Sequence, residues 1–346
     1  MSLETSFERV ELPFEFPFTI ARGTATHAEN VIVTIEDEDG VVGVGGAGPS
    51  AHYGETADTI EAVLPDLLGV VEAVGDPHQL ARIERRMRET VRNNPAARCA
   101  VSIALHDLAA KQLEQPLFRY WGLDPAESVE SSYTIGIDDT ETMREKTETA
   151  VERGYGTLKV KLGTDRDEEI VRTIRETAPD ARIYVDANEA WTPKEAVAKI
   201  EAIAAYDLEF VEQPVPAENP EGLGYVYERS PLPIAADESL ITVDDVPRIA
   251  DRCDVANLKL MKCGGLREAI RIVHAARAHG LQVMCGCMSE SNASIAAACH
   301  LAPLLDYADL DGSLLLAEDV YDGVPMPGGY IDLEALERSG TGAVSE

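Results

Sequence analysis

The second half of the chain alternates short apolar runs with longer segments of helical periodicity. Seven apolar runs end in a charged or polar side chain and follow one another at intervals of about 25 residues, with one interval near 22. They are residues 158–161, 183–186, 210–212, 234–237, 257–259, 283–287 and 309–311. A strand, a helix and two loops take about that many residues. Strand–helix units of this kind close into a barrel whose active site lies at the carboxyl ends of the strands.

The segments between these runs predict helices, because apolar residues recur at spacings of three and four. The predicted helices are residues 140–153, 166–178, 193–205, 242–252, 265–279 and 291–303. A strand at 133–137 precedes the first of them, and no clear eighth barrel helix follows Asp311. The pattern therefore predicts an α/β fold, a (β/α)7β TIM-like barrel.

The pattern differs in the first part of the chain. Residues 7–48 read as a strand meander, in which the runs 31–35 and 41–44 are joined by an acidic turn, a strong hairpin signal. Helices are predicted at 56–68, 79–91 and 96–113. An antiparallel sheet followed by helices predicts an α+β domain.

This pattern predicts two domains. Residues 1–122 form the α+β capping domain, and residues 123–312 form the barrel. Residues 313–346 return to the cap, and the polar stretch 339–346 is expected to be disordered.

The charge of the chain limits its partners. There are 62 acidic and 30 basic residues, so the net charge is −32, and only eight of the basic residues are lysines. Nucleic acids and anionic membrane surfaces need a basic patch, so both are excluded as partners. The acids are dispersed rather than gathered in one tail. Because dispersed acidity keeps a protein soluble in concentrated salt, we hypothesise a halophilic source.

The six cysteines include no CxxC pair, which fits a reducing compartment. The first residues show no charged segment followed by an apolar stretch, as a signal peptide would have. We therefore expect a cytoplasmic protein that acts on a small molecule. A homo-oligomer is compatible with this sequence.

Three acids directly end apolar runs: Asp186, Glu212 and Asp237. Any one of them alone is best read as an ordinary strand-end acid in an acid-rich protein. Three in register favour a metal site. Oxygen ligands of this kind suit a hard octahedral ion, Mg²⁺ or Mn²⁺, with positions left for water and substrate.

Scarce lysines lie in the same runs. Lys159 and Lys161 are two apart on one strand and so share a face. Their mutual repulsion and a nearby divalent cation are expected to lower their pKa values and yield a base, although a structural ion pair with the carboxylates is the alternative. Lys259, taken to lie two strands beyond Asp237, is expected to approach from the opposite side. Lys262 has the other parity and is expected to face outward or end the strand.

These runs contain the motifs Lys159-Val160-Lys161, Asp186-Ala187-Asn188, Val211-Glu212-Gln213-Pro214, Ala236-Asp237-Glu238-Ser239 and the segment from Asn257 to Gly265. Together they resemble the motifs of the enolase superfamily, muconate-lactonizing subgroup. Enolase-superfamily sites combine a Lys or His base with Mg²⁺. The resemblance implies that Mg²⁺ binds the substrate carboxylate and stabilises an enediolate. It also implies that Lys161 and Lys259 are the acid/base groups and that Lys159 assists beside the carboxylate.

The lysines do not set the reaction, because the subgroup contains epimerases, cycloisomerases and synthases that share them. Asp309 and Asp311 share a parity and end the eighth strand, where two negative charges suit the α-ammonium of a dipeptide. The pair resembles the Asp-x-Asp motif of dipeptide epimerases. N-succinylamino acid racemase, o-succinylbenzoate synthase and muconate-type cycloisomerase remain alternatives on the same site.

Other residues give weaker signals. The segment around Arg22 resembles a mobile loop that closes over substrate in these epimerases, and Arg22 is expected to pair with a substrate side-chain carboxylate such as that of glutamate. Glu290 is a low-ranked substrate contact, and Gly46 stands where many relatives carry Glu. Residues 43–48 satisfy GxGxxG, but they follow a hairpin strand and precede Pro49. This context excludes a nicotinamide-binding dehydrogenase.

Overall fold

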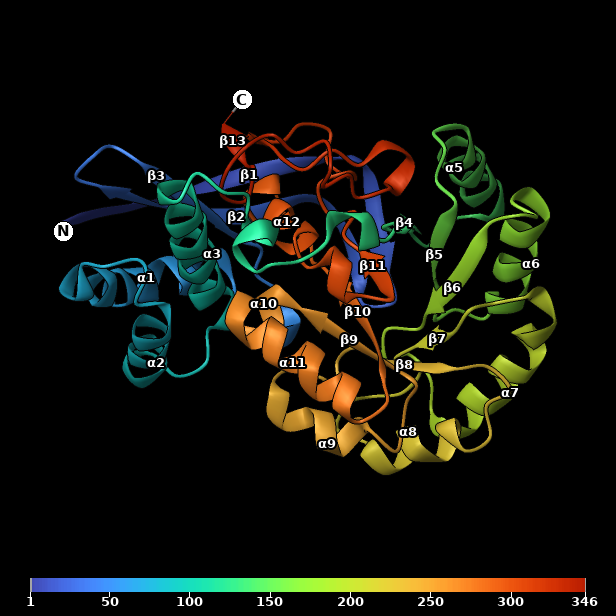
Figure 1. Cartoon of the computed structure of the whole chain (residues 1–346). Coiled ribbons are helices and arrows are strands. Elements are labelled where there is room, and N and C mark those ends of the chain that lie inside the picture. The colour runs from blue at the N-terminus through green and yellow to red at the C-terminus, as the bar shows by residue number, and fades with distance from the viewer. Residues whose placement is uncertain (1, 346) are drawn as a thin grey trace.

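The computed structural model describes residues 2–345. Figure 1 shows a small α+β unit beside a larger unit in which helices surround a parallel sheet. The first unit has a three-stranded antiparallel sheet, and the second has an eight-stranded sheet. The predicted fold class, a (β/α)7β barrel with an α+β cap, is confirmed.

The cap sheet consists of β1 (Leu3–Ile20), β2 (Gly23–Asp37) and β3 (Val42–Ala47) in that order. Its helices are α1 (Ala57–Val74), α2 (Leu80–Thr90), α3 (Pro95–Gln112) and the short α4 (Leu117–Tyr120). The predicted hairpin is β2–β3, where Val33 pairs with Gly45. The helix α3 lies so close to β3 that a Cβ atom on Gly45 would come within 2.1 Å of the Ala100 carbonyl oxygen. Gly43 and Gly45 therefore allow the close packing of α3 on β3.

The barrel strands are β4 (Tyr133–Ile135), β5 (Thr157–Lys161), β6 (Arg182–Asp186), β7 (Val211–Glu212), β8 (Ile234–Ala236), β9 (Val255–Lys259), β10 (Gln282–Gly286) and β11 (Tyr307–Asp309). All neighbouring pairs are parallel and follow chain order. A parallel bridge between Ser131 and Ala308 joins the two end strands. The carboxyl ends of all eight strands therefore meet at one rim.

Seven helices follow the first seven strands. They are α5 (Thr140–Glu152), α6 (Asp167–Thr177), α7 (Pro193–Ile203), α8 (Pro220–Tyr227), α9 (Val246–Ile249), α11 (Leu266–Ala278) and α12 (Asn292–Cys299). The helix α8 was not predicted, because it has only 8 residues and two of them are glycines. Its start still carries a local signal: the Asn219 side chain accepts a hydrogen bond from Gly222 N, and Pro220 occupies the first helical position.

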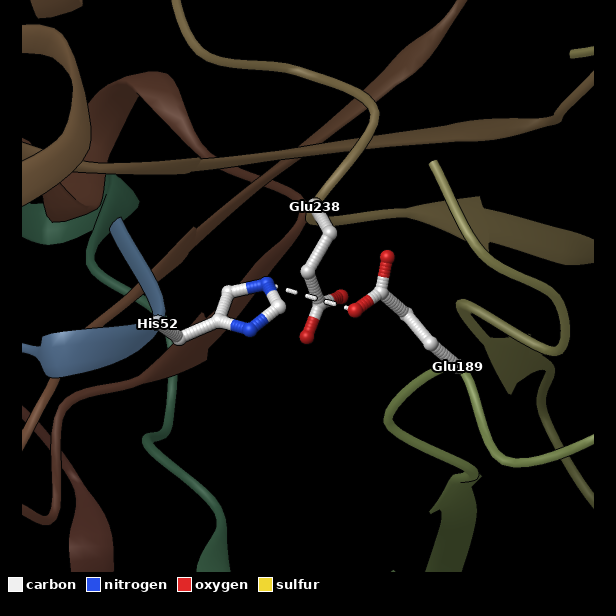
Figure 2. A group of neighbouring side chains, drawn as sticks. All are labelled: His52, Glu189 and Glu238. Carbon is white, nitrogen blue, oxygen red and sulfur yellow. Dashed lines mark ion pairs between the residues drawn. The ribbon is translucent and has the colours of Figure 1, made fainter. Parts of the chain in front are cut away.

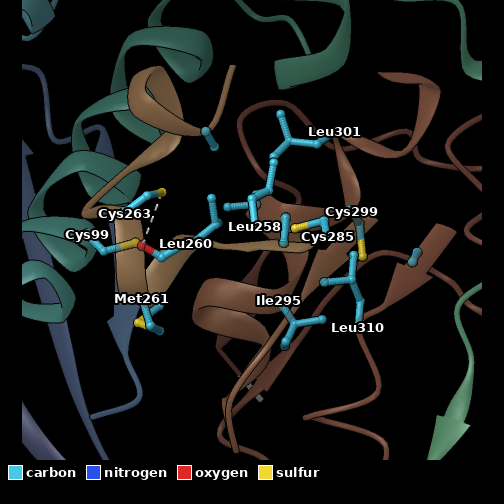
Figure 3. Packing of buried hydrophobic residues seen from close by; sticks show 14 of the residues in the cluster. Cys99, Leu258, Leu260, Met261, Cys263, Cys285, Ile295, Cys299, Leu301 and Leu310 are labelled. Carbon is cyan, nitrogen blue, oxygen red and sulfur yellow. Dashed lines mark hydrogen bonds between the residues drawn. The ribbon is translucent and has the colours of Figure 1, made fainter. Parts of the chain in front are cut away.

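The cap is fixed to the barrel by a shared apolar core. A short helix after β9, α10 (Leu260–Cys263), packs against α3. Figure 3 shows Cys99 of α3 beside Leu260 and Cys263 of α10, and all three side chains are buried. All six cysteines, which lie within the described residues, are free thiols. This contact holds the cap on the rim where the strands end.

Residues 339–345 are ordered, so the expectation of disorder at 339–346 is wrong for this described part of the segment. Thr341 is fully buried, and its backbone N–H donates to Asp107 Oδ1 at 2.7 Å. The strand β13 (Val344–Ser345) pairs with β12 (Tyr321–Asp322). Polar composition misled the prediction, because these polar groups find buried partners in the cap. None of the helices in residues 2–345 has both the length and the hydrophobicity needed to span a bilayer.

Candidate functional site

Three carboxylates lie side by side at the rim of the barrel. Asp186 ends β6, Glu212 ends β7 and Asp237 directly follows β8, which are neighbouring strands. All three residues are fully buried. The regular strand spacing therefore brings together the three acids that the sequence picked out.

A neighbouring donor fixes one oxygen of each carboxylate. The pairs are Asn188 N to Asp186 Oδ1 at 2.8 Å, Asn257 Nδ2 to Glu212 Oε1 at 2.8 Å, and Lys262 Nζ to Asp237 Oδ1. We call the second oxygens, Asp186 Oδ2, Glu212 Oε2 and Asp237 Oδ2, the inner oxygens. They lie near the lysines of the site.

The lysine ammonium groups contact these inner oxygens. Lys161 Nζ lies 2.7 Å from Asp186 Oδ2, Lys159 Nζ lies 2.9 Å from Glu212 Oε2, and Lys259 Nζ lies 2.8 Å from Asp237 Oδ2. Lys159 Nζ also lies 3.2 Å from Asp186 Oδ2. A compact array of alternating charges results.

Lys161 and Lys259 lie on opposite sides of the barrel, but the reason differs from the one expected. Lys259 ends β9, which is the immediate neighbour of β8 and not two strands beyond Asp237. Between β5 and β9 lie β6, β7 and β8 on one side and β10, β11 and β4 on the other. The two ammonium groups therefore approach the centre from opposite walls.

The carboxylates act on the pKa values of two of the lysines. Burial lowers the pKa of Lys159, but the charges of Asp309, Glu212 and Asp186 outweigh it and raise that pKa well above its ordinary value. The pKa of Lys259 is likewise raised, chiefly by Asp237, against the effect of burial. For Lys159 the carboxylates therefore act against the lowering of its pKa that lysine repulsion and a divalent cation were expected to cause.

The same array of charges shifts the pKa values of the acids. Burial acts to raise the pKa of Asp186, but Lys161 and Lys159 lower it below its ordinary value. Glu212 shows the opposite result, because burial and the charge of Asp186 raise its pKa to about 8. Asp186 contacts two ammonium groups and Glu212 contacts one, which accounts for the difference between their pKa values.

Lys262 neither faces outward nor ends the strand, the two placements that its parity predicted. The strand stops at Lys259, and the helical turn α10 directs Lys262 back beneath Asp237. Its ammonium group donates to the Asp237 side chain and backbone carbonyl, and to the Asn257 carbonyl at 3.1 Å. Its exposed fraction is 1%. Lys262 therefore orients Asp237.

Asp309 and Asp311 lie across the barrel from Glu212. Asp309 Oδ2 accepts from Lys159 Nζ at 2.7 Å and Oδ1 accepts from Ser132 Oγ at 2.8 Å. Burial acts to raise the Asp309 pKa, but Lys159 lowers it. Asp311 Oδ2 accepts from Thr134 N at 2.6 Å, and burial together with the charge of Asp309 raises the Asp311 pKa to about 7.

A cavity of about 670 Å³ opens above these groups. The barrel contributes Lys159, Lys161, Lys259, Asp309 and Asp311 to its wall, and the cap contributes residues of the β1–β2 hairpin and of the segment 49–57. A small molecule bound there would touch both units.

The cap and the barrel also meet in a charged cluster, the four residues Arg22, His52, Glu189 and Glu238. Figure 2 shows His52 reaching from the cap toward Glu189 and Glu238 of the barrel. His52 Nε2 lies 3.2 Å from Glu189 Oε2. Arg22 Nη1 lies 2.9 Å from Glu238 Oε1 and 3.4 Å from Glu189 Oε2.

The loops behind the carboxylates hold unusual backbone conformations. Asn188, Glu189 and Gln213 have φ angles of 42°, 68° and 33°. Left-handed backbone at non-glycine residues costs energy and concentrates at functional sites. Gln213 Oε1 accepts hydrogen bonds from Asp237 N at 2.9 Å and Ser239 N at 3.1 Å, so it ties the loop after β7 to the loop after β8.

Sequence reasoning missed some of these positions. Asn257 lies two residues before Lys259 on the same strand, so the parity rule could have placed it on the inner face. Gln213 belongs to the Val211-Glu212-Gln213-Pro214 motif but was assigned no role, and Ser132 carried no comparable signal. Glu290, ranked low as a substrate contact, uses its two oxygens within its own segment, accepting from Met288 N and Ser294 Oγ at 2.7 Å each.

The carboxylates fit a hard divalent cation. Glu212 Oε2 and Asp237 Oδ2 are buried and accept no hydrogen bond from the described residues, although ammonium groups lie 2.9 and 2.8 Å away. Buried oxygens without a hydrogen-bond donor are commonly satisfied by an ion or an ordered water. Mg²⁺ is a hard cation that takes oxygen ligands and keeps some of its waters, so these carboxylate oxygens suit it.

Comparisons with known proteins place this geometry in a family. Residues 3–122 match the model "Mandelate racemase / muconate lactonizing enzyme, N-terminal domain", and residues 142–344 match "Enolase C-terminal domain-like". A relative from Bacteroides thetaiotaomicron, named L-Ala-D/L-Glu epimerase, is 38% identical and the match covers 98% of this chain and 87% of the relative. A relative from Enterococcus faecalis, named hydrophobic dipeptide epimerase, is 39% identical over 92% of this chain and 90% of the relative.

The structure is also similar to solved structures. A dipeptide epimerase from Enterococcus faecalis V583, complexed with Mg and the dipeptide L-Leu-L-Tyr, has a TM-score of 0.91 and 35% identity. The match covers 100% of both chains.

Proposed function

Because the chain belongs to the mandelate racemase/muconate lactonizing enzyme family, we propose that it is a Mg²⁺-dependent epimerase that inverts an α-carbon of a dipeptide. The observation that carries this proposal is the place of Asp309 and Asp311 in the cavity wall, at and after the end of β11, the strand opposite the β7 strand that carries Glu212. A molecule with a cationic end and a carboxylate end suits a cavity lined both by these acids and by the lysines of the site. A dipeptide has both groups, whereas an N-acylated amino acid lacks the cation.

Asp186, Glu212 and Asp237 would hold Mg²⁺ through their inner oxygens. Bound there, the ion supplies charge neutralisation for these carboxylates and for the substrate carboxylate as negative charge develops on it. Two of these acids, Asp237 and Glu212, raise the pKa of Lys259, so cancelling their charge favours a neutral amine.

Lys161 and Lys259 carry the proton transfer. When one amine takes the α-proton, the electron pair of the broken C–H bond delocalises into the adjacent carboxylate. The ammonium on the opposite wall then donates a proton to the other face of the same carbon, and the configuration inverts. Lys159, held between Asp309 and Glu212, contributes positive charge beside the substrate carboxylate. The reverse reaction exchanges the roles of the two lysines.

The pH dependence of kcat/KM tests the role of Asp311. Its pKa of about 7 means that the carboxylate needed to pair with a substrate ammonium is lost as the pH falls below 7. We expect kcat/KM for dipeptides to decrease below about pH 7, because this parameter reports groups of the free enzyme. The Asp311→Asn variant should lower kcat/KM by about 10- to 100-fold and remove this acidic limb. An unchanged limb in that variant would assign the titration to another group.

The proposed reaction is tested by incubating the enzyme with Mg²⁺ and a dipeptide library in D₂O. Mass spectrometry should detect deuterium at one α-carbon of L-Ala-L-X dipeptides, since proton transfer through a lysine exchanges with solvent. N-succinyl amino acids serve as the matched comparison because they lack the ammonium group. Exchange in those compounds alone would overturn the dipeptide proposal and favour a racemase.

A further inference from the structure

The cap side of the cavity offers little positive charge to a substrate. Among the described residues that line the cavity, Arg22 is the only arginine. The lining lysines are Lys159, Lys161 and Lys259, which the proposed reaction uses. A substrate side chain that points away from the barrel toward the cap therefore has Arg22 as its one strong cationic contact.

Arg22 is already committed to the barrel. Its Nη1 donates to Glu238 Oε1 at 2.9 Å, to Glu189 Oε2 at 3.4 Å and to the Asn188 carbonyl at 3.2 Å. Glu238 is 4% exposed, so it depends on this partner for neutralisation. The single guanidinium of Arg22 is therefore the counter-ion of two carboxylates.

The acids around Arg22 make this region of the cavity more negative. Glu238 Oε2 is buried and accepts no hydrogen bond from the described residues. His52 Nε2 lies against Glu189, and the ligand atoms of His52, Glu189 and Glu238 all lie within 4.8 Å of one another. Arg22 already acts as the counter-ion of Glu189 and Glu238. This argues against a second metal bound by His52, Glu189 and Glu238. Any further carboxylate would join a region that already has excess negative charge.

We infer that the cavity selects dipeptides whose inverted residue has an uncharged or cationic side chain and discriminates against an acidic one. This inference rests on the proposed epimerase function. Arg22 acts as a positioning residue that ties the cap to the loops after β6 and β8. A glutamate side chain would place a third carboxylate on this guanidinium, or would leave Glu238 buried without its partner, and both arrangements are unfavourable.

The first test compares near-isosteric substrates. The specificity constant kcat/KM for α-deuterium exchange is measured with L-Ala-L-Glu, L-Ala-L-Gln and L-Ala-L-Lys. L-Ala-L-Gln and L-Ala-L-Lys should each exceed L-Ala-L-Glu by at least about tenfold. Equal or faster exchange of L-Ala-L-Glu would overturn the inference and leave the epimerase proposal intact. An absence of exchange in all dipeptides would instead overturn the epimerase proposal, and the inference with it.

The second test uses Arg22→Met. If Arg22 positions the cap, the variant should lower exchange of L-Ala-L-Gln as well as of L-Ala-L-Glu. The loss for L-Ala-L-Glu should be at least as large, because Glu189 and Glu238 lose their counter-ion. A loss confined to L-Ala-L-Glu would show that Arg22 receives the substrate carboxylate and would overturn the inference. Arg229→Met is the matched control, because Arg229 pairs with its neighbour Glu228 on the outer surface and should leave both rates unchanged.

Discussion

Replacing Lys161 or Lys259 with alanine is expected to lower the rate of epimerisation by about 10²- to 10⁴-fold. Inversion needs a base on one face of the α-carbon and an acid on the other. Each variant keeps only one of these groups. The remaining lysine can still remove and return the proton on its own face, so α-deuterium exchange from one epimer should persist in each variant.

The two variants should therefore differ in which epimer exchanges. NMR of L,L and L,D dipeptides in D₂O measures exchange and inversion separately. Lys194→Ala is a suitable control, because this lysine is exposed on the outer layer of the barrel. Full epimerisation by Lys259→Ala would remove Lys259 from the mechanism. Loss of exchange from both epimers in both variants would instead mean that the lysines act jointly on one face.

Strand ends made much of this site predictable. A parallel barrel gathers its carboxyl ends at one rim, so residues that directly follow apolar runs must lie close together. This rule brings Asp186, Glu212 and Asp237 together, and strand parity puts Lys159 and Lys161 on one face. Both rules depend on regular backbone, and both apply wherever the strands remain regular.

The rules fail where regular backbone ends. Lys262 lies three residues beyond Lys259, and a helical turn rather than a continued strand brings its ammonium group under Asp237. The contacts of Arg22 with Glu189 and Glu238 depend on how the cap docks on the barrel. No local pattern encodes that docking. The lysine pKa values also depend on summed charge in three dimensions, where carboxylates outweigh both burial and mutual repulsion.

Removing Mg²⁺ is expected to abolish exchange and epimerisation together, and adding it back should restore both. Three buried carboxylates and a substrate carboxylate otherwise repel one another. A unit charge at 4 Å is worth about 4 kcal/mol at the dielectric typical of protein sites, which corresponds to about a 10³-fold change in affinity. Glu212→Gln removes one of these charges with little change of shape. We therefore expect it to weaken Mg²⁺ binding by about 10²- to 10³-fold.

Calorimetric titration with Mg²⁺ measures this effect without relying on activity. Asp251→Asn is the control for Glu212→Gln in the same titration, because the Asp251 side chain is 79% exposed. The Asp251→Asn variant should bind Mg²⁺ as the native protein does. Binding to the folded state also raises stability, by about 2.7 kcal/mol at 100 times Kd. The melting temperature of the native protein should therefore rise with Mg²⁺, while that of Glu212→Gln should respond only at much higher concentrations. If Glu212→Gln kept native Mg²⁺ affinity, Glu212 would not be a metal ligand, and its inner oxygen would serve Lys159 alone.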